Sequence, residues 1–254
     1  MTRRIRLPRP AIALTAGLAV TVLASCSTLT GVVSPADARR EAGADKSVSS
    51  LVDCRKDRCV ALTFDGGPSK PTPKLLDLLE KEKVKATFFL QGKGHTDTYP
   101  ATVTRMAKEG HEIGNHTWSH KDLAALTPKQ ITAEIEPVQQ DIKRATGKAP
   151  TLMRPPQGRT DDDVSKVMKG LRLAQILWSV TAKDYQTTDT ELIKKRVLDQ
   201  TERDGIILLH ERYAGTIPAV VDIIPELRKR GYTFVTVSEL MAPATPRPGT
   251  VYRP

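Results

Sequence analysis

Two histidines, His116 and His120, stand four residues apart in the segment Asn115–His120. On one helical turn, side chains at this spacing project in the same direction, so both imidazoles can reach a single metal ion. A divalent metal held by few protein ligands keeps open coordination positions, which hydrolytic chemistry needs. The pair alone is weak evidence, because two histidines at this spacing occur by chance on many surfaces.

Three further residues with chemically useful side chains stand where predicted strands end: Asp65, Arg154 and His210. A carboxylate can remove a proton from water, and an imidazole can donate one near neutral pH. In parallel α/β barrels the carboxyl ends of the strands form the active-site face, so these side chains are expected to meet His116 there. Taken singly, each has a simpler interpretation: Asp65 as the start of a turn, Arg154 as a solvated loop residue and His210 as a core histidine.

The elements that must position these residues are short apolar strands alternating with amphipathic helices. Near-continuous apolar strands predict a parallel sheet covered by helices, either a barrel or an open doubly wound sheet. No Gly-rich dinucleotide fingerprint follows the first strand, which disfavours a Rossmann domain. The predicted strands are Cys59–Phe64, Ala86–Leu90, Glu112–Gly114, Thr151–Arg154, Ala174–Val180, Gly205–Leu209 and Thr233–Val237.

Capping residues mark the helix starts. Thr127 and Gln130 form a predicted capping box, and Thr188 with Glu191 forms another. The last helix is predicted near Pro218–Arg230, where apolar residues recur at helical spacing before a glycine.

The amino-terminal segment predicts export. The first ten residues carry four Arg and no acid, and an apolar run follows from Ala11 to Ala24. Fourteen helical residues rise roughly 21 Å, short of the ~30 Å hydrocarbon core, so the run predicts a signal peptide and not a span. It ends in small residues directly before Cys26, which resembles a bacterial lipobox with a lipidated cysteine. The alternative is an ordinary cleaved signal with an incidental Cys26.

The two remaining cysteines, Cys54 and Cys59, are an even pair in an exported chain, so a disulfide closing a small loop is expected. The alternative is two free thiols, which would oxidise outside the cell.

The formal net charge of +10 falls to +6 without the four leader arginines, and a moderately basic surface suits an anionic bacterial wall. Aromatic content is only 4%, so little is present to stack bases, and no nucleic-acid partner is expected. The predicted organisation is a lipoprotein signal peptide over 1–25, a flexible tether over 26–50, a catalytic-type domain over 51–241 and a disordered Pro-rich tail over 242–254.

Taken in order, five segments resemble the NodB-type polysaccharide deacetylases, carbohydrate esterase family 4. The resemblance covers roughly residues 58–240 and implies an α/β fold, a distorted (β/α) barrel of the NodB homology type with fewer units than eight. The matching segments are Leu62–Ser69, Glu109–His120, Arg154–Gly158, Trp178–Tyr185 and Leu208–His210.

The resemblance also implies roles for individual side chains. Asp65 matches the general base, and His116 and His120 match the metal-binding histidines. Arg154 matches the cation that orients the base, and His210 the general acid that protonates the departing sugar amine. The implied cofactor is a divalent metal, zinc first, with cobalt, nickel or manganese as alternatives.

A second group is implied to contact substrate. Leu208 matches a wall of the pocket for the acetyl methyl group, and the backbone N–H of Gln157 matches an oxyanion donor. Asp184 is kept from the family pattern, and Tyr185 stands where a Trp usually lines the acetyl pocket. Trp118 is expected either to stack on sugar or to pack near the histidines.

Three positions depart from the family pattern more seriously. Gly66 replaces the Asp that completes a His-His-Asp metal site, Gln157 replaces a usual Tyr, and Thr181 replaces an Asp that steadies the arginine. Losing an anionic metal ligand is expected to weaken metal binding by at least ~10–100-fold.

The resulting hypothesis is a metal-dependent hydrolase that removes N-acetyl groups from a wall polysaccharide such as peptidoglycan. Two alternatives remain: a noncatalytic glycan-binding lipoprotein on a deacetylase scaffold, and an esterase that removes O-acetyl groups. The expected location is the outer face of the bacterial membrane, with a lipid anchor on Cys26, or the medium if Cys26 is not lipidated. The chain is expected to be monomeric.

Overall fold

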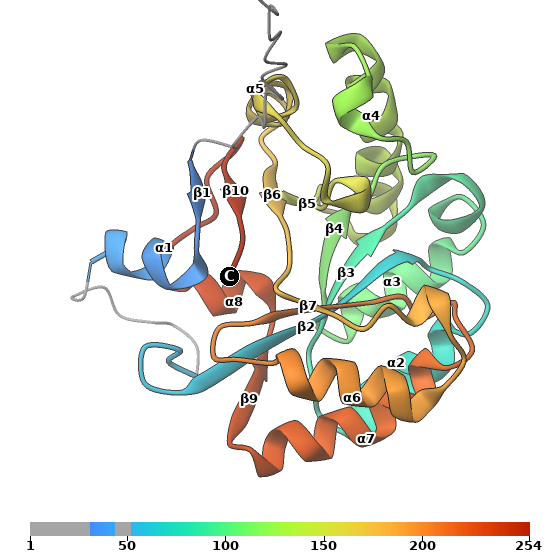
Figure 1. Ribbon diagram of the computed structural model, residues 1–254. Helices are drawn as coiled ribbons and strands as arrows, with labels where there is room; N and C mark the ends of the chain where they lie inside the picture. Colours follow the sequence, from blue (N-terminus) through green and yellow to red (C-terminus); the bar gives the residue numbers. More distant parts are fainter. Residues whose placement is uncertain (1–30, 44–51) are drawn as a thin grey trace, which may run out of the picture.

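A computed structural model describes residues 31–43 and 52–254, in which ten strands form one parallel sheet that curls into part of a barrel (Figure 1). The order is β1-β10-β6-β5-β4-β3-β2-β8-β7, with β9 paired to β2. The strands are β1 Val32–Val33, β2 Arg58–Gly67, β3 Thr87–Leu90, β4 Glu112–Asn115, β5 Leu152–Met153, β6 Ala174–Ile176, β7 Val180–Thr181, β8 Ile206–Leu209, β9 Tyr232–Val235 and β10 Val251–Tyr252. The predicted distorted (β/α) barrel is confirmed.

Helices cover the outside of the sheet (Figure 1). They are α1 Pro35–Glu41, α2 Thr72–Lys81, α3 Pro100–Lys108, α4 Pro128–Thr146, α5 Asp162–Gly170, α6 Thr190–Gln200, α7 Thr216–Lys229 and α8 Val237–Met241. The capping box of Thr127 and Gln130 is confirmed at α4. The capping box predicted for Thr188 and Glu191 is wrong. Instead the Asp189 carboxylate caps α6 by accepting the backbone N–H of Leu192.

Strand register explains why the chemically useful residues gather at one edge. Phe64 of β2 pairs with Phe88 of β3 and with Leu209 of β8. Asn115, at the end of β4, pairs with Met153 of β5. Asp65, His116, Arg154 and His210 each follow one of these paired residues directly. Parallel strands in register end together, so all four residues lie at the carboxyl edge of the sheet.

The predicted strand over 174–180 is divided into β6 and β7, which lie far apart in the sheet order. The chain leaves the sheet after Ile176, and Val180 resumes pairing beside Ile207 of β8.

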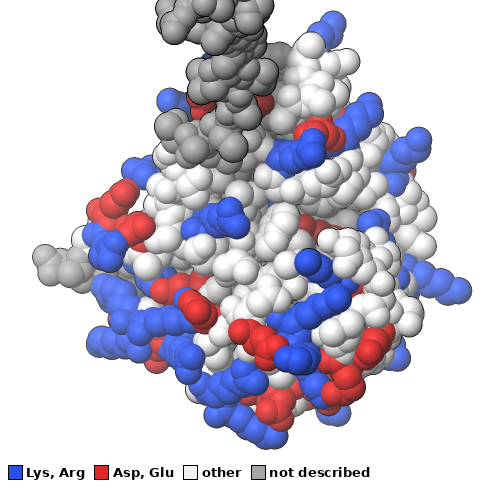
Figure 2. All heavy atoms as spheres, viewed as in Figure 1, with Lys and Arg blue, Asp and Glu red and all other residues white. Residues whose placement is uncertain are grey.

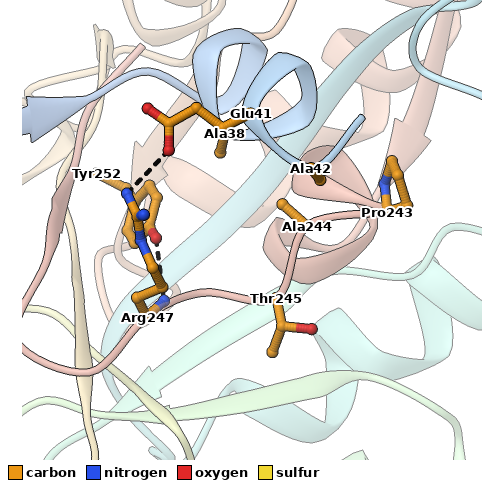
Figure 3. Close-up of a pocket in the computed structure, with 8 residues that line it drawn as sticks. All are labelled: Ala38, Glu41, Ala42, Pro243, Ala244, Thr245, Arg247 and Tyr252. Carbon is orange, nitrogen blue, oxygen red and sulfur yellow. Dashed lines mark hydrogen bonds and ion pairs between the residues drawn. The ribbon is translucent and has the colours of Figure 1, made fainter. Parts of the chain in front are cut away.

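The predicted tether over 26–50 and tail over 242–254 are wrong where the structure describes them. Residues 31–43 hold β1 and α1, and the carboxyl-terminal segment holds β10, which pairs β1 on one side and β6 on the other. Figure 3 shows how the two segments meet: Arg247 pairs with Glu41 at 3.0 Å and donates its N–H to the Tyr252 hydroxyl at 3.0 Å. Composition suggested disorder because each segment is short, and the contacts that order it come from a segment distant in the sequence.

The disulfide between Cys54 and Cys59 is present, as expected. Among the described residues no helix has the length and apolar character needed to span a bilayer. The predicted signal peptide and Cys26 lie outside the described residues. Lys and Arg side chains are interspersed with Asp and Glu over much of the face in Figure 2.

His111, directly before β4, gives the stability of the fold a predicted pH dependence. Its Nδ1 accepts the Ala86 N–H at 3.2 Å, and burial lowers its pKa from 6.5 to about 4. The unfolded chain therefore binds the proton more tightly, and stability is complete above pH 6.5 and falls as the pH drops toward 4. We expect a loss of roughly 3 kcal/mol across that window from this group.

Urea unfolding at pH 7 and at pH 4 measures this loss. His111→Asn is the matched control, because its side-chain carbonyl can accept the same N–H without titrating in this range. An equal loss of stability in the wild type and the variant would show that His111 does not cause it.

Candidate active site

A cavity of about 370 Å³ opens at the carboxyl edge of the sheet. Seven of the residues predicted from the sequence line it, and Arg154 lies behind Asp65. The lining residues are Asp65, His116, His120, Gln157, Trp178, Thr181, Tyr185, Leu208, His210, Arg212 and Tyr213.

Asp65 and Arg154 form a buried ion pair. Arg154 Nη1 donates to Asp65 Oδ1 at 2.8 Å, and both side chains are at most 3% exposed. Nη1 also donates to Thr63 Oγ1 at 2.7 Å, and Nε donates to the Ile176 carbonyl at 3.0 Å. The guanidinium carbon lies 4.2 Å from the centre of the Phe89 ring. Because a buried charge is costly without a partner, each of these two charges offsets the other, and the pair engages Oδ1 so that Oδ2 of Asp65 faces His116.

These contacts also bear on the departure at Thr181, which stands where the family pattern has a carboxylate that steadies the arginine. In this chain the Thr63 hydroxyl and the carbonyl of Ile176 help to orient the guanidinium. Thr181 instead bonds Gln200 through its backbone.

The two imidazoles come together in a loop, so the predicted helical turn is wrong. Thr117 and His120 adopt left-handed backbone angles, with φ of 68° and 60°. The Asn115 side chain accepts the Thr117 N–H at 2.8 Å, and the Thr117 hydroxyl accepts the His120 N–H at 3.0 Å. These local bonds hold a backbone conformation that non-glycine residues rarely adopt, and they bring the rings of His116 and His120 to 5.0 Å between centroids.

His116 has the form that a metal ligand requires. Its Nδ1 donates to the Arg154 carbonyl at 2.8 Å, so the lone pair lies on Nε2, 3.9 Å from Asp65 Oδ2. Burial lowers its pKa from 6.5 to about 4, which keeps the ring neutral. Burial also lowers the pKa of His120, and the positive charge of Arg212 adds to that effect.

The donor set fits a divalent metal in part. Two neutral imidazoles suit zinc and similar metals, and Asp65 is the carboxylate that faces them. Gly66 offers no side chain, and within residues 31–43 and 52–254 no three His, Cys, Asp or Glu residues are arranged to hold an ion together. His116 and His120 therefore are the residues that would hold a metal, without a third strong ligand.

His210 is held by Asp184, which corrects the expected role of Asp184 as a substrate contact. Asp184 is buried, and its Oδ1 lies 2.8 Å from His210 Nδ1. Its Oδ2 accepts the His210 backbone N–H at 2.6 Å and the Thr216 hydroxyl at 2.7 Å. The carboxylate orients the ring so that Nε2 is free for chemistry.

Asp184→Asn is expected to lower kcat of the hydrolysis expected from the sequence by about 10²-fold or more. The amide oxygen would accept the two bonds now made to Oδ2, so the NH₂ group would face Nδ1 and hold the ring in the wrong tautomer. Acetate release at saturating substrate measures the effect. Asp189→Asn, at the exposed cap of α6, is the matched control. An unchanged kcat in a folded variant would contradict this role.

The remaining predicted contacts divide into two groups. Leu208, Gln157 and Tyr185 line the cavity, and the Tyr185 and His210 rings lie 5.8 Å apart. Trp118 does not line it. Its ring packs where a Cβ on Gly92 would lie, 2.1 Å from the nearest ring atom, so Trp118 is a packing residue.

Four cavity residues were not predicted as site residues: Trp178, Thr181, which was named only as a departure from the family pattern, Arg212 and Tyr213. Each is next to, or inside, a segment that carried the resemblance. Arg212 and Tyr213 follow His210 at the end of β8, which is the available sequence signal.

Comparisons with known proteins agree with this arrangement. The polysaccharide deacetylase family model matches residues 53–176. The chain is 40% identical over 184 residues to peptidoglycan-N-acetylmuramic acid deacetylase PdaC of Bacillus subtilis, covering 72% of this chain but only 38% of PdaC. It is 37% identical over 191 residues to PdaA of the same organism, a peptidoglycan-N-acetylmuramic acid deacetylase, covering 73% of this chain and 72% of PdaA.

Solved structures show the same similarity. A T48 deacetylase with substrate superposes with a TM-score of 0.76 at 36% identity, covering 80% of this chain and all of that chain. A mutant of BA3943, described as a CE4 family pseudoenzyme with restored enzymatic activity, superposes with a TM-score of 0.69 at 27% identity, covering 73% and 68%.

Proposed function

This chain belongs to the polysaccharide deacetylase family, and from that premise we propose that it removes N-acetyl groups from a cell-wall polysaccharide such as peptidoglycan. The observation that carries the proposal is one cavity lined by Asp65, which pairs with Arg154, and by His210, which is held by Asp184. A base and an acid held by separate partners are what amide hydrolysis needs.

The side chains divide the reaction between them. Asp65 Oδ2 takes a proton from the attacking water, whose oxygen bonds to the acetyl carbon. The backbone N–H of Gln157 is assigned to the carbonyl oxygen as negative charge develops there. His210 Nε2 gives a proton to the sugar nitrogen as the carbon–nitrogen bond breaks, and acetate and the free amine leave.

The metal and the cellular setting are part of the proposal. When bound by His116 and His120, a divalent metal, zinc first, supplies Lewis acidity at the acetyl carbonyl. The export signal supports a location outside the cell, and the lipobox-like sequence supports a lipid anchor on Cys26. The proposed protein is a monomer that acts on an acetylated amino-sugar polymer.

A second candidate is a noncatalytic glycan-binding protein on the same scaffold. It is supported by Gly66, which cannot bind a metal, and by the similarity to a solved protein described as a pseudoenzyme. An esterase that removes O-acetyl groups would use the same side chains.

One experiment separates these functions. Residues 27–254 are purified, supplied with zinc, cobalt, nickel or manganese, and assayed for acetate release from peptidoglycan, N-acetylglucosamine oligomers and O-acetylated xylan. Metal-stimulated release from the first two supports the N-deacetylase. Release from xylan alone supports the esterase, and binding of glycans without any release supports the binding protein.

A further inference from the structure

Arg212 lies beside Gly66, the position where the family pattern has a metal-binding Asp. A Cβ built on Gly66 would be 3.4 Å from Arg212 Nη1 and 3.5 Å from its Cζ. An aspartate at position 66 would therefore place its carboxylate beside this guanidinium and neutralise it. Glycine leaves the guanidinium open to the cavity that Arg212 lines.

Within the described part of the chain, no carboxylate forms an ion pair with Arg212. Its Nη2 donates to the Tyr213 hydroxyl at 3.2 Å, and its Cζ lies 5.1 Å from the centre of that ring. The carboxyl of Glu211 is turned away, because its Oε1 accepts the Thr72 hydroxyl at 2.9 Å in a buried position against Gly67. The Arg212 side chain is exposed on the cavity side of this loop.

A guanidinium that is open to the cavity and has no carboxylate partner is suited to bind a carboxylate on the substrate. A guanidinium binds a carboxylate through two parallel hydrogen bonds, which a hydroxyl or a neutral amide cannot reproduce. In a 2-acetamido sugar the neighbouring substituent is on oxygen 3. N-acetylmuramic acid carries a lactyl carboxylate there, whereas N-acetylglucosamine carries only a hydroxyl.

We propose that Arg212 is a specificity residue that binds a carboxylate next to the reacting acetamido group, so that the chain prefers acidic amino sugars of the N-acetylmuramic acid type over N-acetylglucosamine. The proposal rests on the proposed function for the choice of substrate. Gly66 is part of the same arrangement, since an acidic residue at that position would form an ion pair with the Arg212 guanidinium and leave it unavailable to substrate.

The test compares three tetrasaccharides. One alternates N-acetylglucosamine with N-acetylmuramic acid bearing free lactyl carboxylates, the second carries methyl amides in their place, and the third is an N-acetylglucosamine tetramer. Dissociation constants are measured by calorimetry in the His210→Asn background, where turnover is suppressed, and kcat/KM is measured in the parent. We expect the acidic sugar to be preferred over the methyl amide by about 10- to 100-fold, and Arg212→Gln to reduce this ratio to about 1.

Arg212→Lys should retain part of the preference through its charge, and Arg144→Gln, an exposed arginine on α4, should retain all of it. No preference in the parent, or an unchanged ratio in Arg212→Gln, overturns the proposal. If no sugar releases acetate, the proposed function fails, but the ratio of dissociation constants still tests Arg212.

Discussion

Replacing Asp65 with asparagine is expected to lower kcat for acetate release by roughly 10²- to 10⁴-fold, the largest loss we expect from any single substitution. The amide retains the size of the carboxylate and can still accept from Arg154, but it cannot take a proton from water. Steady-state acetate release from the preferred substrate measures the effect.

The same substitution leaves the buried Arg154 charge without its counter-ion, so stability must be measured alongside activity. We expect a loss of about 3 kcal/mol in the free energy of unfolding, at the lower end for a broken buried pair because one hydrogen bond survives. Asp163→Asn, which breaks an exposed pair with Lys166, is the matched control and should change neither quantity. A folded Asp65→Asn protein with normal kcat would remove Asp65 from the role of base.

Restoring a carboxylate at position 66 is expected to raise zinc affinity, with an effect that depends on Arg212. In Gly66→Asp/Arg212→Gln the new carboxylate is free to join His116 and His120, and we expect zinc to bind at least 10- to 100-fold more tightly than in the parent. Gly66→Asp alone should gain less, because Arg212 lies within reach of the new side chain and competes with the metal.

Zinc calorimetry on the four proteins of this double-mutant cycle measures the coupling directly. Arg212→Gln alone controls for the loss of a nearby positive charge, and His116→Ala in the double variant should abolish the gain. Equal zinc dissociation constants in all four proteins would mean that position 66 does not face the metal-binding histidines.

The two adjacent glycines of this turn, Gly66 and Gly67, differ in whether a side chain fits at their positions. Gly66 has φ of 77°, a left-handed angle that Asp adopts more readily than most residues, and the nearest atoms belong to the end of a flexible side chain. A Cβ on Gly67 would lie 1.8 Å from Glu211 Oε1, so a side chain there is excluded by the buried carboxyl. Position 66 can therefore be tested by substitution, whereas a side chain at position 67 would collide with the buried Glu211 carboxyl.

Local sequence patterns were enough to predict the alternation of buried strands and helices and the residues that follow each strand. A parallel strand buried on both faces must be continuously apolar, so a polar residue directly after such a run marks the carboxyl end of the strand. This local rule, combined with the expected parallel barrel, predicted Asp65, Arg154 and His210 at one edge of the sheet, and the resemblance to the family supplied their roles. The helix cap at Thr127 was equally local, since its partners lie within one turn.

The way in which these side chains are held, by contrast, depends on the folded chain. Asp184 was expected to touch substrate, but it bonds His210, 26 residues later in the chain. The histidine pair was expected on a helix, but it lies in a loop whose left-handed residues are fixed by side-chain bonds. Arg212 meets Gly66 only because β2 and β8 are neighbours in the sheet. Each of these outcomes depends on contacts between residues distant in sequence or on a particular loop conformation, which periodicity and spacing do not encode.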